Sequence, residues 1–202
     1  MCIMDRDSAE HLFMVYQTVS SHEPWVVPYN RLQDEKLNAF AYTDYSVGLL
    51  IDSLKTLPQW DNLLVIMIPD HGYLYKQSYE DPEFFHSPML WLGGAIRQPR
   101  RMQVLMNQSD LAATLLSQLG ISHRDYPWSR NVLSRNYTYP FAYCCFPAGI
   151  MWKDHTGETL FDITANSLVT DHHAGGEERL RKAQSVLQTG YDWYSEQMHT
   201  FR

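Results

Sequence analysis

Blocks of apolar residues separated by polar turns predict a chain of mixed helices and strands. The clearest block is Leu63–Ile68, six apolar residues in a row, which predicts a strand buried on both faces of a parallel sheet. A helical spacing of apolar residues over Arg31–Leu57 predicts a long helix that Pro58 ends. Three further apolar blocks predict strands: Leu12–Val19, Pro88–Leu92 and Arg101–Met106.

The C-terminal part of the chain changes to β-prone segments followed by one amphipathic helix. The elements expected here are a helix Asp110–Leu119 with Ser109 as its N-cap, strands within Tyr137–Met151, Glu158–Ile163 and Ser167–Thr170, and a helix Glu177–His199. The expected fold is therefore α/β, with a mostly parallel central sheet flanked by helices, a small antiparallel subsheet and a C-terminal helix. We expect a single domain over residues 1–202.

Composition narrows the class of protein. The 202 residues are 45% apolar and 19% charged, which is typical of a globular chain with one sizeable core. A formal net charge of -7 argues against nucleic acid as a partner, because phosphate binding needs a basic surface. No apolar run approaches the roughly 20 residues that span a bilayer, and Met1–Glu10 has no signal-peptide pattern.

Two polar clusters follow predicted strands and are candidates for chemistry. Asp70 and His71 follow Leu63–Ile68 after a single proline, at the strand end where α/β sheets place their ligand crevice. A carboxylate and a neutral imidazole together suit zinc or manganese, and Gly72 would allow a sharp turn after them. His22 follows the predicted strand Leu12–Val19 and would lie near this pair, where it could donate a hydrogen bond to a metal-held anionic oxygen. The alternative is that both clusters are ordinary polar turns.

We expect structural roles for Asp44 and for the charged residues that begin the final helix. Asp44 falls on the apolar stripe of the predicted helix Arg31–Leu57, so we expect a buried, hydrogen-bonded carboxylate. The final helix begins with charged residues that we expect to be solvated: Glu177, Glu178, Arg179, Arg181 and Lys182.

Five segments in one order extend this interpretation. They are Val15–Trp25, Tyr42-Thr43-Asp44, Ile68–Gly72, His86–Trp91 and Ser109–Leu116. Over about residues 12–150 the chain resembles the C-terminal part of the catalytic domain in the sulfatase-like branch of the alkaline phosphatase superfamily. Within that branch it is most similar to the lipoteichoic acid synthase and phosphoglycerol transferase group.

This resemblance implies a catalytic domain that binds a divalent ion, commonly manganese or zinc, with calcium or magnesium as alternatives. Such a domain hydrolyses or transfers phosphate or sulfate esters through a covalent intermediate on a threonine or related nucleophile. The resemblance implies that Asp70 and His71 bind the metal and that His22 contacts the anionic group of the substrate. It leaves His86 as a candidate pocket residue, and Asp110 matches a position that is structural.

The resemblance also implies what this chain lacks. No nucleophile stands in a matching context N-terminal to His22, so we expect a fragment of a larger catalytic domain that binds metal weakly and is inactive alone. The expected partners are the rest of that domain and a phosphate or sulfate ester, lipid- or glycan-linked. The parent would be membrane-anchored with an extracytoplasmic catalytic domain, and this fragment soluble. The alternative function is a non-catalytic binding or assembly module, weakly supported by four tryptophans that could line a surface: Trp25, Trp128, Trp152 and Trp193.

Overall fold

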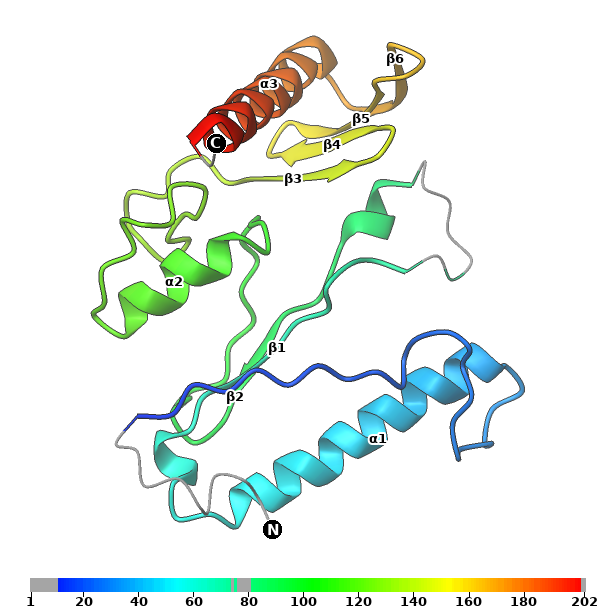
Figure 1. The fold of residues 1–202 in the computed structure, drawn as a ribbon, viewed down its shortest axis with the longest axis vertical. Helices are drawn as coiled ribbons and strands as arrows, with labels where there is room; N and C mark the ends of the chain where they lie inside the picture. The colour runs from blue at the N-terminus through cyan, green and yellow to red at the C-terminus, as the bar shows by residue number, and fades with distance from the viewer. Residues whose placement is uncertain (1–10, 74, 76–80, 201–202) are drawn as a thin grey trace. The chain divides into compact units, whose positions relative to one another are not determined.

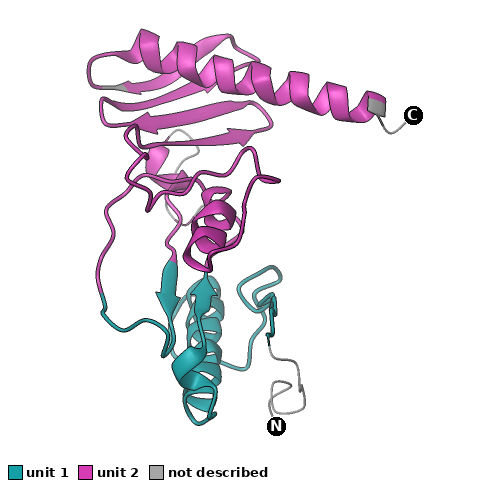
Figure 2. Ribbon diagram, turned by 90° about the vertical axis from the view of Figure 1, so that its left-hand side faces the viewer, with its two compact units in different colours: residues 1–67, 90–99 teal, residues 68–89, 100–202 magenta. Residues whose placement is uncertain are grey.

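A computed structural model describes residues 11–73, 75 and 81–200 of the chain (Figure 1). The residues divide into two compact units (Figure 2). Unit 1 comprises residues 1–67 and 90–99, and unit 2 comprises residues 68–89 and 100–202. The expectation of a single domain over residues 1–202 stays a prediction.

Unit 1 contains the predicted long helix, α1 (Glu35–Lys55). Asp34 caps its N-terminus, because its side chain accepts a hydrogen bond from the Leu37 N–H at 3.0 Å. Glu35 in the first turn and Lys55 in the last turn complement the helix dipole. The expectation for Asp44 is wrong, since this residue is exposed; the buried residues of α1 lie elsewhere on the helix, at Asn38, Ala39 and Leu54.

The short sheet of unit 1 contains two of the predicted strands. β1 (Val65–Met67) and β2 (Leu90–Leu92) pair antiparallel, with Ile66 opposite Trp91. The side chains of β1 are only half-buried, so the expected burial on both faces is wrong. No parallel strand pair occurs among the described residues, and the mostly parallel arrangement stays a prediction.

Two predicted strands are absent from the structure of the described residues. Residues 12–19 and 101–106 adopt no regular secondary structure. In the first segment the side chains of Phe13 and Val15 are 82% and 78% exposed. A β-prone sequence becomes a strand only when another strand pairs with its backbone, and neither segment has such a partner among the described residues.

Unit 2 is built on a four-stranded antiparallel meander. Its strands are β3 (Phe141–Phe146), β4 (Gly149–Asp154), β5 (Gly157–Asp162) and β6 (Ser167–His172), paired in sequence order. The helix α3 (Gly176–Thr200) packs along one face of this sheet (Figure 2). The α/β class, the antiparallel subsheet and the C-terminal helix are therefore confirmed.

The core of unit 2 lies between α3 and the sheet. Ile150, Trp152 and Phe161 are buried there with Ala183 of the helix. The Trp152 ring stacks on Phe141 of the neighbouring strand, with ring centroids 4.6 Å apart. Unit 2 also contains the shorter helix α2 (Asp110–Gln118), which begins at the predicted residue.

Candidate functional site

Asp70 and His71 form a bend near the start of unit 2, with two residues between the end of β1 and Asp70. The His71 N–H donates a hydrogen bond to Asp70 Oδ1 at 3.1 Å. Asp70 Oδ2 lies 3.8 Å from His71 Nε2, and the two side chains are 80% and 72% exposed. One oxygen of the carboxylate is thus engaged by the backbone, and the other lies beside an accessible imidazole nitrogen.

The second ring nitrogen of His71 fixes the tautomer. His71 Nδ1 lies 2.6 Å from the Gly72 carbonyl oxygen. Since a carbonyl oxygen only accepts, Nδ1 carries the proton and donates, which leaves Nε2 with its lone pair in the neutral ring. Metal-binding histidines commonly make such a hydrogen bond from the nitrogen that does not bind the ion.

This pair fits a divalent cation. One ion can contact Asp70 Oδ2 and His71 Nε2 together, because their separation of 3.8 Å is below the sum of two bonds of about 2.1 Å. No group of three or more His, Cys, Asp or Glu side chains that could hold a metal occurs in the part of the chain that the structure describes. Asp70 and His71 thus offer two ligands to such an ion.

Gly72 is required by the close approach of two backbone segments. A Cβ atom at this position would lie 2.0 Å from the carbonyl oxygen of Phe84. Phe84 belongs to the 3₁₀ helix η3 (Pro82–Phe85), so the segment that carries Asp70 and His71 packs tightly against η3. Gly72 does not adopt the left-handed conformation, and the predicted role in a sharp turn is replaced by this packing role.

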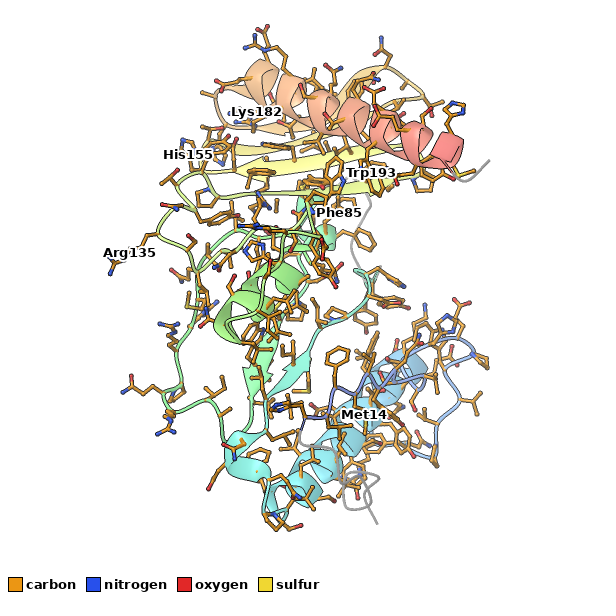
Figure 3. The ribbon with its side chains drawn as sticks, turned by 60° about the vertical axis from the view of Figure 1, so that its left-hand side comes forward. Met14, Phe85, Arg135, His155, Lys182 and Trp193 are labelled. Atoms are coloured by element: carbon orange, nitrogen blue, oxygen red, sulfur yellow. The ribbon has the colours of Figure 1, made fainter. Side chains whose placement is uncertain are left out.

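The helix η3 is itself tied to the sheet of unit 2. Asp81 caps it by accepting a hydrogen bond from the Glu83 N–H at 3.0 Å, and Pro82 occupies the first turn. Phe85 stacks on Phe146 of β3 with centroids 5.6 Å apart, and Figure 3 shows Phe85 beside the sheet. The stacking places η3 between the sheet and the Asp70–His71 segment.

His86, the candidate pocket residue, follows η3 and pairs with Glu83. His86 Nδ1 lies 3.2 Å from Glu83 Oε2. The other Glu83 oxygen accepts from Lys153 Nζ at 3.4 Å, and Lys153 also contacts Glu158 Oε2 at 2.8 Å. The hydrogen bond from His86, assisted by Lys153, lowers the pKa of Glu83 below its usual value despite partial burial. Glu83 is therefore ionised at neutral pH between two donors.

The residues that precede α2 contact the backbone just before Asp70. The Gln108 side chain donates a hydrogen bond to the Pro69 carbonyl oxygen, and the adjacent Asn107 accepts from the Tyr143 N–H at 2.8 Å. Asp110 is fully buried and accepts from the Asn107 N–H at 2.8 Å and from Arg130 Nε at 2.9 Å. This geometry supports a structural role for Asp110. Ser109 is the N-cap residue of α2 as expected, but its side chain makes no capping hydrogen bond.

His22 belongs to unit 1, whereas Asp70, His71 and His86 belong to unit 2. It is exposed in a polar turn, and its Nδ1 lies 2.9 Å from the Glu23 carbonyl oxygen. This contact leaves Nε2 of His22 open to a ligand. The convergence of His22 on the Asp70–His71 pair stays a prediction.

Two surface hollows of unit 2 lie away from Asp70, His71 and His86. One of about 530 Å³ is lined by residues of α3 and Trp152, and one of about 750 Å³ surrounds the turn between β4 and β5. Neither is lined by Asp70, His71 or His86. The side chains of Asp70, His71 and His86 are 80%, 72% and 75% exposed, so they lie at an open surface.

The structure corrects one expectation about the final helix and adds residues that sequence reasoning missed. Arg179 is fully buried, because its guanidinium donates to Asp171 Oδ1 at 2.7 Å and to Thr159 Oγ1 at 2.8 Å.

The sequence did not identify Glu83 and Lys153 as neighbours of His86. The three-residue spacing of Glu83 and His86 is a local signal, but Lys153 lies 70 residues from Glu83 and no sequence pattern links them.

Comparisons with known proteins agree with this fold. A family model described as Sulfatase matches residues 3–121, more than half of the chain, and this range includes all four predicted site residues. A solved structure of a protein in the alkaline phosphatase superfamily from Vibrio parahaemolyticus is similar with a TM-score of 0.70 and 22% sequence identity. The similarity covers 89% of this chain and 48% of that one, so this chain spans about half the length of its structural neighbour. Within the described residues, no helix is long and apolar enough to cross a membrane.

Proposed function

This chain belongs to the sulfatase family, and from that premise we propose that it forms part of the active site of a metal-dependent enzyme acting on phosphate or sulfate esters. The reaction is hydrolysis or transfer of the ester group. Within the family we assign the chain to the lipoteichoic acid synthase and phosphoglycerol transferase group, as the C-terminal part of the catalytic domain. The order of the five sequence segments supports this branch, and the structural neighbour supports the superfamily fold.

The observation that carries the proposal is the arrangement of Asp70 and His71. Asp70 Oδ2 and His71 Nε2 are exposed and close together, and the Gly72 carbonyl keeps the proton of His71 on Nδ1. These two atoms would hold manganese or zinc, with calcium or magnesium as alternatives. A bound divalent ion supplies Lewis-acid stabilisation of negative charge on the transferring group.

The other predicted residues act on the substrate itself. His22 donates a hydrogen bond to a non-bridging oxygen of the phosphate or sulfate group, which stabilises charge that develops there. His86 is a further candidate for contact with the ester. The substrate is an anionic ester, lipid- or glycan-linked, and the parent enzyme is membrane-anchored with its catalytic domain outside the cytoplasm.

We propose that the remaining ligands and the nucleophile come from the rest of the catalytic domain. The two ligands among the described residues support this division of the site. The apolar side chains exposed along residues 12–19, including Met14 in Figure 3, also support it, since such a surface is normally covered by another part of a protein. We therefore expect the chain alone to bind metal weakly and to be inactive.

Metal-linked thermal unfolding tests the assignment of the ligands. Manganese or zinc chloride, added in increasing concentration, should raise the melting temperature, because an ion at 100 times its dissociation constant stabilises the folded state by about 2.7 kcal/mol. Asp70→Ala and His71→Ala should abolish the increase, and the control Asp52→Ala, an exposed carboxylate on α1, should keep it. An increase that persists in both ligand variants, or none at millimolar metal, would refute the site and favour a non-catalytic binding or assembly module.

An activity assay tests the division of the active site. The chain alone should turn over neither aryl phosphate nor aryl sulfate esters in the presence of manganese. Turnover that Asp70→Ala abolishes would show that the chain carries its own nucleophile. That result would overturn the proposal that the nucleophile comes from another part of the catalytic domain.

A further inference from the structure

We propose that Glu83, held by Lys153 of β4, is a positioning residue that accepts a hydrogen bond from His86 Nδ1–H and so orients the ring, with Nε2–H of the imidazolium form facing the anionic group of the ester. This inference rests on the proposed function and specifies how His86 serves the same site. It concerns two side-chain contacts, one from Lys153 in β4 to Glu83 in η3 and one from Glu83 to the His86 imidazole.

The acceptor chemistry of Glu83 determines the tautomer of His86. The Glu83 carboxylate is ionised at neutral pH and therefore only accepts hydrogen bonds. Its Oε2 lies 3.2 Å from His86 Nδ1, so this nitrogen must carry the proton. The proton stays on Nδ1, and the neutral ring keeps a lone pair on Nε2. The imidazolium form keeps the same orientation and donates from Nε2 to an anionic oxygen.

The position of Glu83 depends on the sheet. Lys153 lies opposite Glu158 in the register of β4 and β5, and its Nζ contacts Glu158 at 2.8 Å and Glu83 at 3.4 Å. The neighbours of Lys153 along β4, Trp152 and Asp154, are buried, so the lysine projects from a well-packed strand. Lys153 therefore restrains the Glu83 carboxylate through Oε1, the oxygen that His86 does not contact.

A second contact keeps η3 against the sheet independently of these charges. Phe85 stacks on Phe146, and Phe84 contacts Gly72 through its backbone. Glu83 is 53% exposed and Lys153 is 34% exposed, so water screens their attraction and it adds little stability. We therefore expect this pair to affect mainly the orientation of His86. A variant of Glu83 should remain folded.

Nuclear magnetic resonance measures the tautomer of His86 without substrate or metal. Long-range proton–nitrogen correlation at a pH where His86 is neutral reports which nitrogen is protonated, and His86→Gln identifies the signal. We expect mostly Nδ1–H in the wild-type chain. Glu83→Ala should shift the population toward Nε2–H, and Lys153→Met should shift it in the same direction to a smaller extent. The control Glu178→Gln removes a carboxylate that pairs with Lys182 on α3 and should leave the signal unchanged.

Titration with inorganic phosphate separates this inference from the proposed function. At a pH where His86 is an imidazolium, phosphate should perturb the wild-type His86 signal, and Glu83→Ala should weaken the apparent phosphate affinity several-fold. A wild-type ring that is mainly Nε2–H, or a tautomer unchanged by Glu83→Ala in a chain with a wild-type melting curve, would overturn the positioning role. A tautomer change without any phosphate response would instead refute the anion-binding role of His86 and leave positioning by Glu83 standing.

Discussion

Removal of the Asp110 carboxylate should destabilise unit 2 far more than removal of an exposed carboxylate. Asp110 is fully buried and receives four hydrogen bonds, from the Asn107 N–H and from three donors of Arg130. In Asp110→Ala the Arg130 guanidinium, which is 24% exposed, loses its only anionic partner among the described residues.

The expected magnitude follows from this burial. Removing one partner of a buried ion pair typically costs about 3–5 kcal/mol, because the other charge is left without compensation. Arg130 keeps a hydrogen bond to the Phe141 carbonyl and its position over the Phe141 ring at 3.8 Å, which places the cost in this range and not above it. For a chain of this size, each kcal/mol lowers the melting temperature by about 2–4 °C. We therefore expect a loss of roughly 6–20 °C.

Urea unfolding followed by near-ultraviolet circular dichroism measures this effect, since the buried Trp152 reports on unit 2. Asp125→Ala, an exposed carboxylate in the same unit, is the matched control and should change the free energy of unfolding by less than about 0.5 kcal/mol. Asp110→Leu combined with Arg130→Met should recover most of the loss, because it removes both charges. A loss below about 1 kcal/mol in Asp110→Ala would refute the structural role of this pair.

Two further predictions address the site segment and the acid stability of unit 2. Gly72→Ala should lower the free energy of unfolding by about 1–3 kcal/mol and weaken the metal-linked increase in melting temperature, because the new Cβ meets the Phe84 carbonyl. For Asp154, burial alone would raise the pKa, but hydrogen bonds from Thr156, Tyr139 and Trp152 outweigh it and hold the pKa well below the usual range. The stabilisation from this carboxylate is therefore present above about pH 4 and is lost as the pH falls toward the folded-state value. Asp154→Asn should thus be less stable than wild type at neutral pH, with a difference that shrinks under acid.

Two results would contradict the predictions for Gly72→Ala and Asp154→Asn. Gly72→Ala with wild-type stability and metal response would mean that the approach of Gly72 to η3 is not needed. For Asp154, urea unfolding at several pH values between 2 and 7 measures the difference between variant and wild type. A difference that stays constant across this range would show that the carboxylate is not preferentially ionised in the folded state.

Local sequence patterns predicted the elements whose signals lie within a few residues. The helical spacing of apolar residues over Arg31–Leu57 predicted α1, and the β-prone segments predicted the antiparallel subsheet that precedes α3. Leu63–Ile68 predicted β1 and located Asp70 and His71 after it. The strand expected at residues 12–19 was wrong for the described residues, because strand formation needs a backbone partner that local sequence does not contain.

For the candidate site as well, the local sequence predicted some features and only folding determined others. The identities and adjacency of Asp70 and His71 are properties of the sequence, and they fix which ligand atoms the chain offers. The Gly72 contact with Phe84 and the pairing of Lys153 with Glu83 join residues that are 12 and 70 positions apart. Which charges meet across such separations depends on how the chain packs, and the burial of Arg179 and Asp110 follows from partners brought close only by folding. Sequence alone thus determined the chemistry available to this protein, and tertiary structure decided which groups restrain it.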